Sequence, residues 1–136
     1  MMKYVLKEGK NLRTESPIFY AMAAPVSGVV KIDNLAKEIS RECTLTPHDI
    51  RAVISAMEER IIEHMQNGQS VRLGLLGSFR PTIKSKSTAK AEAFSNSNIR
   101  GVAVAFTPSS TMRYELSKDN PDMEFQMLKE KDEEKG

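Results

Sequence analysis

The sequence predicts an α+β protein, on three observations. Apolar residues recur at spacings of three and four between residues 47 and 67, which indicates a long amphipathic helix. Apolar and polar residues alternate in segments 71–79 and 99–107, the pattern of half-buried strands. A length of 136 residues with 40% hydrophobic residues and no tryptophan allows only a modest core. We therefore expect one domain, or one protomer of an intertwined dimer.

The first part of the chain is predicted to be a small β extension, residues 1–32. Residues 3–7 and 18–24 are candidate strands, and Ser16-Pro17 signals a turn between them. A second turn at residues 25–28 leads to Val29, Val30 and Ile32, a third apolar segment that is expected to pair with the second strand as a hairpin.

A short helix is expected next, followed by a loop. Asp33 or Asn34 can cap it, because a short side-chain acceptor satisfies amides that lack an intrahelical partner. Leu35 and Ile39 would share one face. Cys43, the single cysteine, is expected to be a small buried apolar group, because no helix start, histidine or basic cluster stands next to it to activate it as a nucleophile.

The long helix has clear signals at both ends. Thr46 is a good N-cap, Pro47 suits the first helical position, and Gly68 follows the expected end near Asn67. Its apolar stripe consists of Ile50, Val53, Ile54, Met57, Ile61 and Met65. At about 1.5 Å per residue the helix spans roughly 30 Å, long for so small a domain, and it needs a partner.

A β segment with a basic continuation follows the helix. Val71, Leu73 and Leu75 alternate with Arg72 and Gly74, and Leu76-Gly77 marks a turn or bulge before a second strand at Ser78. Cations then occupy even positions of that strand, so an extended chain would carry them on one positive face. They are Arg80, Lys84 and Lys86.

The rest of the chain contains one more clear strand. Residues 87–98 are small and polar, and the part around Phe94 is either one or two helical turns or half of a flexible hairpin. Residues 99–107 read as a strand, and Thr107-Pro108 is expected to open a last short helix. In the tail, 119–136, the alternation through Phe125 and Met127 indicates a strand that could pair with residues 3–7. The charged end is expected to be disordered and to compete weakly for the basic face.

Charge is segregated along the chain, although the net charge is only +2. Residues 69–113 hold seven Lys or Arg and the single acid Glu92, whereas residues 33–68 hold four cations and seven acids. Residues 119–136 hold seven acids and three lysines. The pattern favours a polyanion-binding face on a folded body, with a solvated face of chance composition as the alternative.

Two motifs resemble the HU and integration-host-factor family of bacterial histone-like DNA-binding proteins. The first is the turn in residues 71–79, where the family usually has glycine and phenylalanine in place of Leu75 and Leu76. The second is Phe106-Thr107-Pro108 followed by Met112, similar to the step that closes the HU domain. The resemblance covers about residues 33–118 and implies a DNA-binding and dimerisation domain.

The resemblance implies an intertwined homodimer that binds double-stranded DNA. The expected dimer core is Ile54, Met57, Ile61, Met65, Leu73, Leu76, Phe79 and Phe106. The expected DNA-binding residues are Arg72, Arg80, Lys84, Lys86, Lys90, Arg100 and Arg113. Family members that bend DNA carry a proline at the arm tip, but this chain has none between Pro81 and Pro108. Phe94 could act as a wedge instead, although burial against the body is the favoured expectation.

The sequence offers no catalytic or metal-binding constellation. His48 and His64 lie sixteen residues apart, and no paired-cysteine spacing or phosphate-binding glycine loop occurs. We expect no enzyme activity, no cofactor and no small-molecule substrate. With no apolar run long enough for a membrane span and no secretory signal, we expect a cytoplasmic, nucleoid-associated protein.

Two functions remain. The first is a largely sequence-independent, histone-like DNA-binding protein, and the second is an HU-like scaffold whose altered arm serves protein interaction. The nearly acid-free block 69–113 favours the first.

Overall fold

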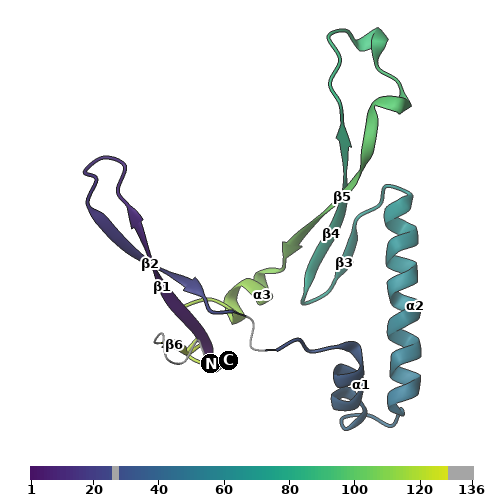
Figure 1. The fold of residues 1–136 in the computed structure, drawn as a ribbon. Helices are drawn as coiled ribbons and strands as arrows, with labels where there is room; N and C mark the ends of the chain where they lie inside the picture. Colours follow the sequence, from purple (N-terminus) through teal and green to yellow (C-terminus); the bar gives the residue numbers. More distant parts are fainter. Residues whose placement is uncertain (26–27, 129–136) are drawn as a thin grey trace. The chain divides into compact units, whose positions relative to one another are not determined.

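The computed structural model describes residues 1–25 and 28–128, and the chain divides into two compact units. The first unit comprises residues 1–30 and 114–136, and the second comprises residues 31–113. Among the described residues there are three α-helices and two three-stranded sheets (Figure 1), so the predicted α+β class is confirmed. The expectation of a disordered charged tail at 129–136 lies outside the described residues.

The first unit contains one small sheet of order β2-β1-β6. Strand β1 (Met2–Lys10) pairs antiparallel with β2 (Pro17–Ala23) and parallel with β6 (Phe125–Met127). The predicted pairing of the tail with the N-terminal strand is thus confirmed. The predicted hairpin between β2 and residues 29–32 is wrong. Val29 and Val30 are not in a strand, and β2 pairs with β1 instead because those two strands align over seven residue pairs.

Helix α1 (Ile32–Ser40) begins earlier than expected. Its N-cap is Lys31, and the Asn34 side-chain oxygen accepts the Lys31 backbone N–H at 3.3 Å, so Asn34 acts from inside the first turn. Ile32 is therefore helical. The prediction that Cys43 is buried is also wrong: Cys43 is exposed, because α1 ends before it and the residue lies in the loop between the helices.

Helix α2 (Pro47–Gln66) has the predicted bounds. The Thr46 hydroxyl oxygen accepts the Asp49 N–H at 3.2 Å, and Pro47 occupies the first turn, where its missing N–H costs nothing. Gly68 has a φ of 79°, a left-handed conformation that favours glycine just after a helix. Both predicted ends are confirmed.

The Thr46 cap supports a first prediction. Thr46→Ala should lower the free energy of unfolding by about 1 kcal/mol, because one amide of the first turn of α2 loses its acceptor. Urea unfolding at a fixed protein concentration measures this loss. Thr44→Ala, two residues earlier and outside both helices, is the control and should change stability by less than about 0.5 kcal/mol. Equal losses from the two variants would contradict the cap.

The second unit contains the other sheet, of order β3-β4-β5 and antiparallel throughout. Strand β3 (Val71–Leu73) turns into β4 (Gly77–Ser85) through residues 74–76, where the Leu76 N–H donates to the Leu73 carbonyl at 2.8 Å. The turn beside Gly77 is confirmed. Strand β5 (Ile99–Pro108) returns along β4. Single 3-10 turns at Ala91–Ala93 and Asn96–Asn98 lie between β4 and β5.

The last helix, α3 (Ser110–Glu115), starts later than predicted. Strand β5 continues through Thr107 and Pro108, which pair with Ser78 and Gly77. The Ser109 hydroxyl oxygen, rather than a group on Thr107, accepts the Met112 N–H of the first turn, at 3.0 Å. The helix is therefore present, with Ser109 in the capping position.

The described chain buries little apolar surface by itself. Only Val5, Ala36 and Ile50 among its hydrophobic residues are buried, with exposed fractions of 6%, 1% and 5%. Large hydrophobic side chains are exposed on most elements, including β2, α2, β4 and β5. A soluble monomer rarely leaves contiguous apolar surface of this kind uncovered.

Candidate functional site

The second sheet has a face that carries cations. Arg72 pairs with Ser78 on β4, and Arg80 and Lys84 lie on the same side of β4 as Ser78, because alternate residues of a strand share a face. The residues across from Arg80 and Lys84 on β5 are Ala105 and Gly101, which are small. We call Arg72, Arg80 and Lys84 the basic face. The predicted single face is thus present for Arg80 and Lys84, and the register adds Arg72.

The opposite side of this sheet is apolar. Its residues are Val71, Leu73, Phe79, Pro81, Ile83, Val102, Val104 and Phe106. The rings of Phe79 and Phe106 are tilted by 43° with centroids 5.0 Å apart. A cavity of about 490 Å³ lies between this face and α2 residues Ile62 and Met65. The sheet therefore separates a basic face from an apolar one, and the apolar one is directed at α2.

The other predicted DNA-binding residues lie outside the basic face. Lys86 is one residue beyond β4, and its backbone N–H donates to the Asn98 carbonyl at 2.8 Å. Lys90 precedes the first 3-10 turn. Arg100 is the extra residue at a register shift, because Lys84 pairs with Gly101 and Ser85 with Ile99. Arg113 lies on α3. We call β4, β5 and the segment between them the arm, residues 77–108 (Figure 1).

The seven predicted cations are exposed, and none of them pairs with an acid within residues 1–25 and 28–128. In the part of the chain that the structure describes, the ion pairs are Arg51 with Asp33 at 2.6 Å and Arg60 with Glu63 at 2.5 Å. Both lie on α1 or α2. All seven predicted cations are exposed side chains in the second unit. They are thus available to an anion in solution.

The predicted dimer core splits into two groups. Five of its members are half-buried within the chain: Ile54, Ile61, Met65, Leu73 and Phe79. The other three are exposed: Met57, Leu76 and Phe106. Sequence reasoning missed three further exposed members of the apolar face, Ile83, Val102 and Val104. The available signal was the alternation of Ile83 with Phe79 along β4, and of Val102 and Val104 with Phe106 along β5.

Phe94 does not bury against the body in this chain. Its side chain is 42% exposed, so the expectation of burial is wrong for the single chain. It follows the 3-10 turn Ala91–Ala93, and its N–H donates to the Ala91 carbonyl at 3.1 Å, which directs the residue into the segment between β4 and β5.

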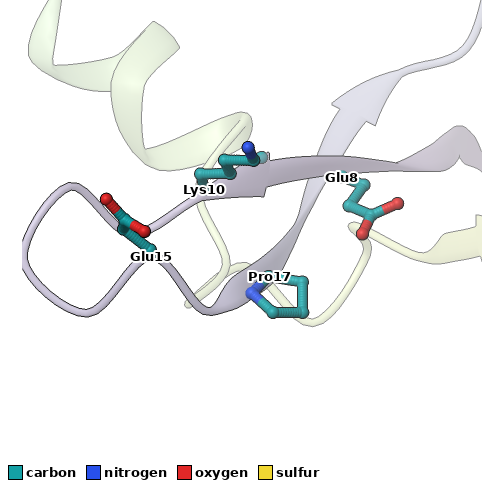
Figure 2. A pocket seen from close by; sticks show the side chains of 5 residues that line it. Glu8, Lys10, Glu15 and Pro17 are labelled. Atoms are coloured by element: carbon teal, nitrogen blue, oxygen red, sulfur yellow. The ribbon is translucent and has the colours of Figure 1, made fainter.

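A separate pocket in the first unit does not gather reactive groups. It has a volume of about 510 Å³ and lies at the end of the β1–β2 hairpin. Figure 2 shows the carboxylates of Glu8 and Glu15 at opposite ends of it, with Lys10 between them. Among the described residues, no group of three or more His, Cys, Asp or Glu side chains could hold a metal ion. None of the described helices is long and apolar enough to cross a membrane.

The helix pair, the three-stranded sheet and the projecting arm together define an HU-like domain, with an additional small sheet in the first unit. A family described as HU domains fused to wHTH, Ig or glycine-rich motifs, HU-HIG, matches residues 1–122. The chain belongs to this HU-HIG family. The predicted HU-like membership is confirmed, and the match includes the N-terminal residues as well as 33–118.

Two solved structures share this fold. One is a putative bacterial DNA-binding protein from Bacteroides vulgatus, 20% identical, with a TM-score of 0.59 over 93% of this chain and 48% of that one. The other is Anabaena HU in a cocrystal with DNA, 20% identical, with a TM-score of 0.52 over 65% of this chain and 99% of that one. This chain spans about half the length of the Bacteroides protein. No curated protein matches the sequence.

Proposed function

We propose that this protein is a dimeric, largely sequence-independent DNA-binding protein of the bacterial nucleoid, without enzymatic activity. The observation that carries the proposal is the basic face: Arg72, Arg80 and Lys84 share one side of a sheet whose other side is apolar. The family membership and the likeness to the fold of a DNA-bound HU support it. Residues 33–118 would form the DNA-binding and dimerisation domain.

The spacing of the cations suits phosphates rather than base edges. Arg80 and Lys84 are four residues apart on one strand, roughly 13 Å at about 3.3 Å per residue, so they reach different phosphates. Small residues across from them leave the backbone of the sheet accessible to a large ligand. Lys86, Lys90 and Arg100 extend the contact along the arm, and Arg113 adds a cation on α3. Such contacts carry affinity without sequence information.

The uncovered apolar surface supports the proposed dimer. Ile83, Val102 and Val104 on the apolar face are exposed by 69%, 64% and 60%, beside the cavity against α2. Two of the three exposed members of the predicted dimer core, Met57 and Phe106, add to this surface. A second copy, packing through the same residues, would cover it as the resemblance to HU implies. Two protomers would then present two arms to one duplex.

The main test is the salt dependence of DNA binding by Arg80→Ala and Lys84→Ala. Each substitution removes one phosphate contact per protomer and two per dimer. The slope of log affinity against log salt should therefore shrink by up to about two. Fluorescence anisotropy with several unrelated duplexes across a salt series measures this. Lys37→Ala, an exposed cation on α1, is the matched control and should leave the slope unchanged.

The outcomes separate the candidate functions. Similar losses on all duplexes support phosphate contacts, and a loss confined to one sequence would argue for base readout. Unchanged binding in both variants would reject the arm as a DNA-binding element. It would then favour the second candidate function, an HU-like scaffold for protein interaction. The absence of a proline at the arm tip supports that alternative.

A further inference from the structure

Strand β2 is apolar, is exposed along its whole length and has one open edge among the residues that the structure describes. All seven residues from Pro17 to Ala23 are exposed, and none is charged. Within residues 1–25 and 28–128, only β1 pairs with it, so β2 is the outer strand of its sheet (Figure 1). Natural edge strands are usually short, charged, bulged or covered, because their free backbone groups attract other strands. Among the described residues of the first unit, β2 has none of these protections apart from its initial proline.

The open edge of β2 offers a defined set of backbone groups. Just beyond the strand, the Ala24 N–H donates to the Lys3 carbonyl at 2.9 Å, so Ala24 points its backbone groups toward β1. Alternate residues of an antiparallel pair point the same way. Every second residue of β2 before Ala24 therefore faces β1, as Ala24 does. The residues that alternate with these direct their N–H and C=O groups away from β1, at the free edge. These residues are Phe19, Ala21 and Ala23.

The charge pattern favours a second copy of β2 as the partner. No charged residue occurs between positions 16 and 30, although 28% of the chain is charged, so an antiparallel pair of two β2 strands brings no like charges together. Strand β1, which carries three lysines and Glu8, lies at the centre of the sheet between β2 and β6. The other edge strand, β6, has only three residues. β2 is thus the edge best suited to self-association.

One side of the sheet also carries exposed apolar residues that self-association would bring together, next to Glu8 and Lys10. Leu6 on β1 pairs with Ala21, and Phe19 lies on the same side of the sheet. Met2 pairs with Phe125 of β6 on that side as well. All four large side chains are exposed. Joining two sheets at β2 would place two such surfaces side by side and bury part of each.

We propose that β2 pairs antiparallel with β2 of a second copy, so that two three-stranded sheets become one six-stranded sheet. The contact lies entirely in the first unit. It is distinct from the dimer surface around α2 and the apolar face, and it does not depend on DNA binding. If it joins different HU-like dimers it produces tetramers, and if it lies within one dimer it tightens that dimer.

Ala21→Pro tests the proposal. Proline removes an N–H at the open edge, while the β1–β2 pairing keeps its own hydrogen bonds. Ala21→Val is the matched control, because it retains the amide and suits a strand. In sedimentation over a concentration series, Ala21→Pro should weaken self-association at least tenfold, and Ala21→Val should not. Equal association of the two variants, each folded by circular dichroism, would overturn the proposal.

Cross-linking tests the geometry directly. In a Cys43→Ser background, single cysteines replace Phe19 and Ala21 in separate variants. The residue at the centre of an antiparallel pair of identical strands opposes its own copy, with Cα atoms about 4.5–5.5 Å apart, within disulfide range. The control replaces Leu12, which is 98% exposed in the loop between β1 and β2. Under mild oxidation without DNA, a β2 cysteine should form covalent dimers at least tenfold faster than the loop cysteine. Equal rates would overturn the proposal. The proposal would also be overturned if the β2 cysteines neither react with an alkylating reagent nor cross-link, because another surface would then cover β2.

Discussion

Met57→Asp is expected to abolish the proposed dimer at micromolar concentration. In the single chain Met57 is 43% exposed, so a carboxylate there would remain solvated and cost a monomer little. In a dimer formed around α2, the same position would be covered by the partner. An unpaired buried charge costs about 3 kcal/mol or more, and two related sites give roughly 6 kcal/mol, a weakening on the order of 10⁴-fold. Analytical ultracentrifugation from nanomolar to high micromolar concentration measures it.

The neighbouring residue provides the control for that variant. Ala56 is exposed and lies about 100° around α2 from Met57, away from the inward stripe of Ile54, Ile61 and Met65. Ala56→Asp adds the same charge to the same helix turn with a comparable cost in helix propensity. It should leave the dimer intact. If both variants remain dimeric with unchanged affinity, α2 does not form the dimer surface in the way proposed.

The parts of the fold that local signals determine could be predicted from the sequence. The start of α2 depends on Thr46 and Pro47, and its end on Gly68, all within a few residues of the boundary. The turn before β4 depends on Gly77 in the same way. The alternation around Phe125 indicated the strand itself, whereas its pairing with β1 joins residues far apart in the sequence. The boundaries of these elements need no knowledge of distant residues.

The errors arose where distant residues decide the outcome. Val29 and Val30 have strand propensity, but β2 pairs with β1 over seven residue pairs, and Asn34 accepts the Lys31 N–H at the start of α1, which includes Ile32. Phe94 is apolar, but in the segment between β4 and β5 its side chain remains 42% exposed. For the candidate site, the period of two places Arg80 and Lys84 together. Only the pairing of β3 with β4 shows that Arg72 joins them. Register is a long-range property that one strand's sequence does not contain.

Gly77→Ala is expected to be the most destabilising single-methyl change in the second unit. Gly77 is buried where β4 begins between β3 and β5, and its φ of 150° is one that L side chains rarely adopt. An added Cβ would collide with the Thr107 carbonyl oxygen and lie 2.9 Å from the Pro108 Cα. Both are backbone atoms of β5, so relief requires the strands to separate. We expect a loss of about 3–5 kcal/mol in urea unfolding at fixed protein concentration.

Gly101→Ala separates the two causes of that loss, which are the backbone strain at a positive φ and the collision of the added Cβ with β5. Gly101 has a nearly identical φ of 156°, but an added Cβ there meets nothing within 4 Å. It should therefore show only the backbone strain, about 1–3 kcal/mol. The difference between the two variants measures the close approach of β4 and β5 at Gly77. Gly77 pairs with both β3 and β5 in the register that places Arg80 across from Ala105, so under the proposed function the Gly77 variant should also lose DNA affinity at temperatures where Gly101→Ala retains it. Equal stability losses in the two variants would show that the conformation of the glycine, rather than strand contact, makes Gly77 necessary.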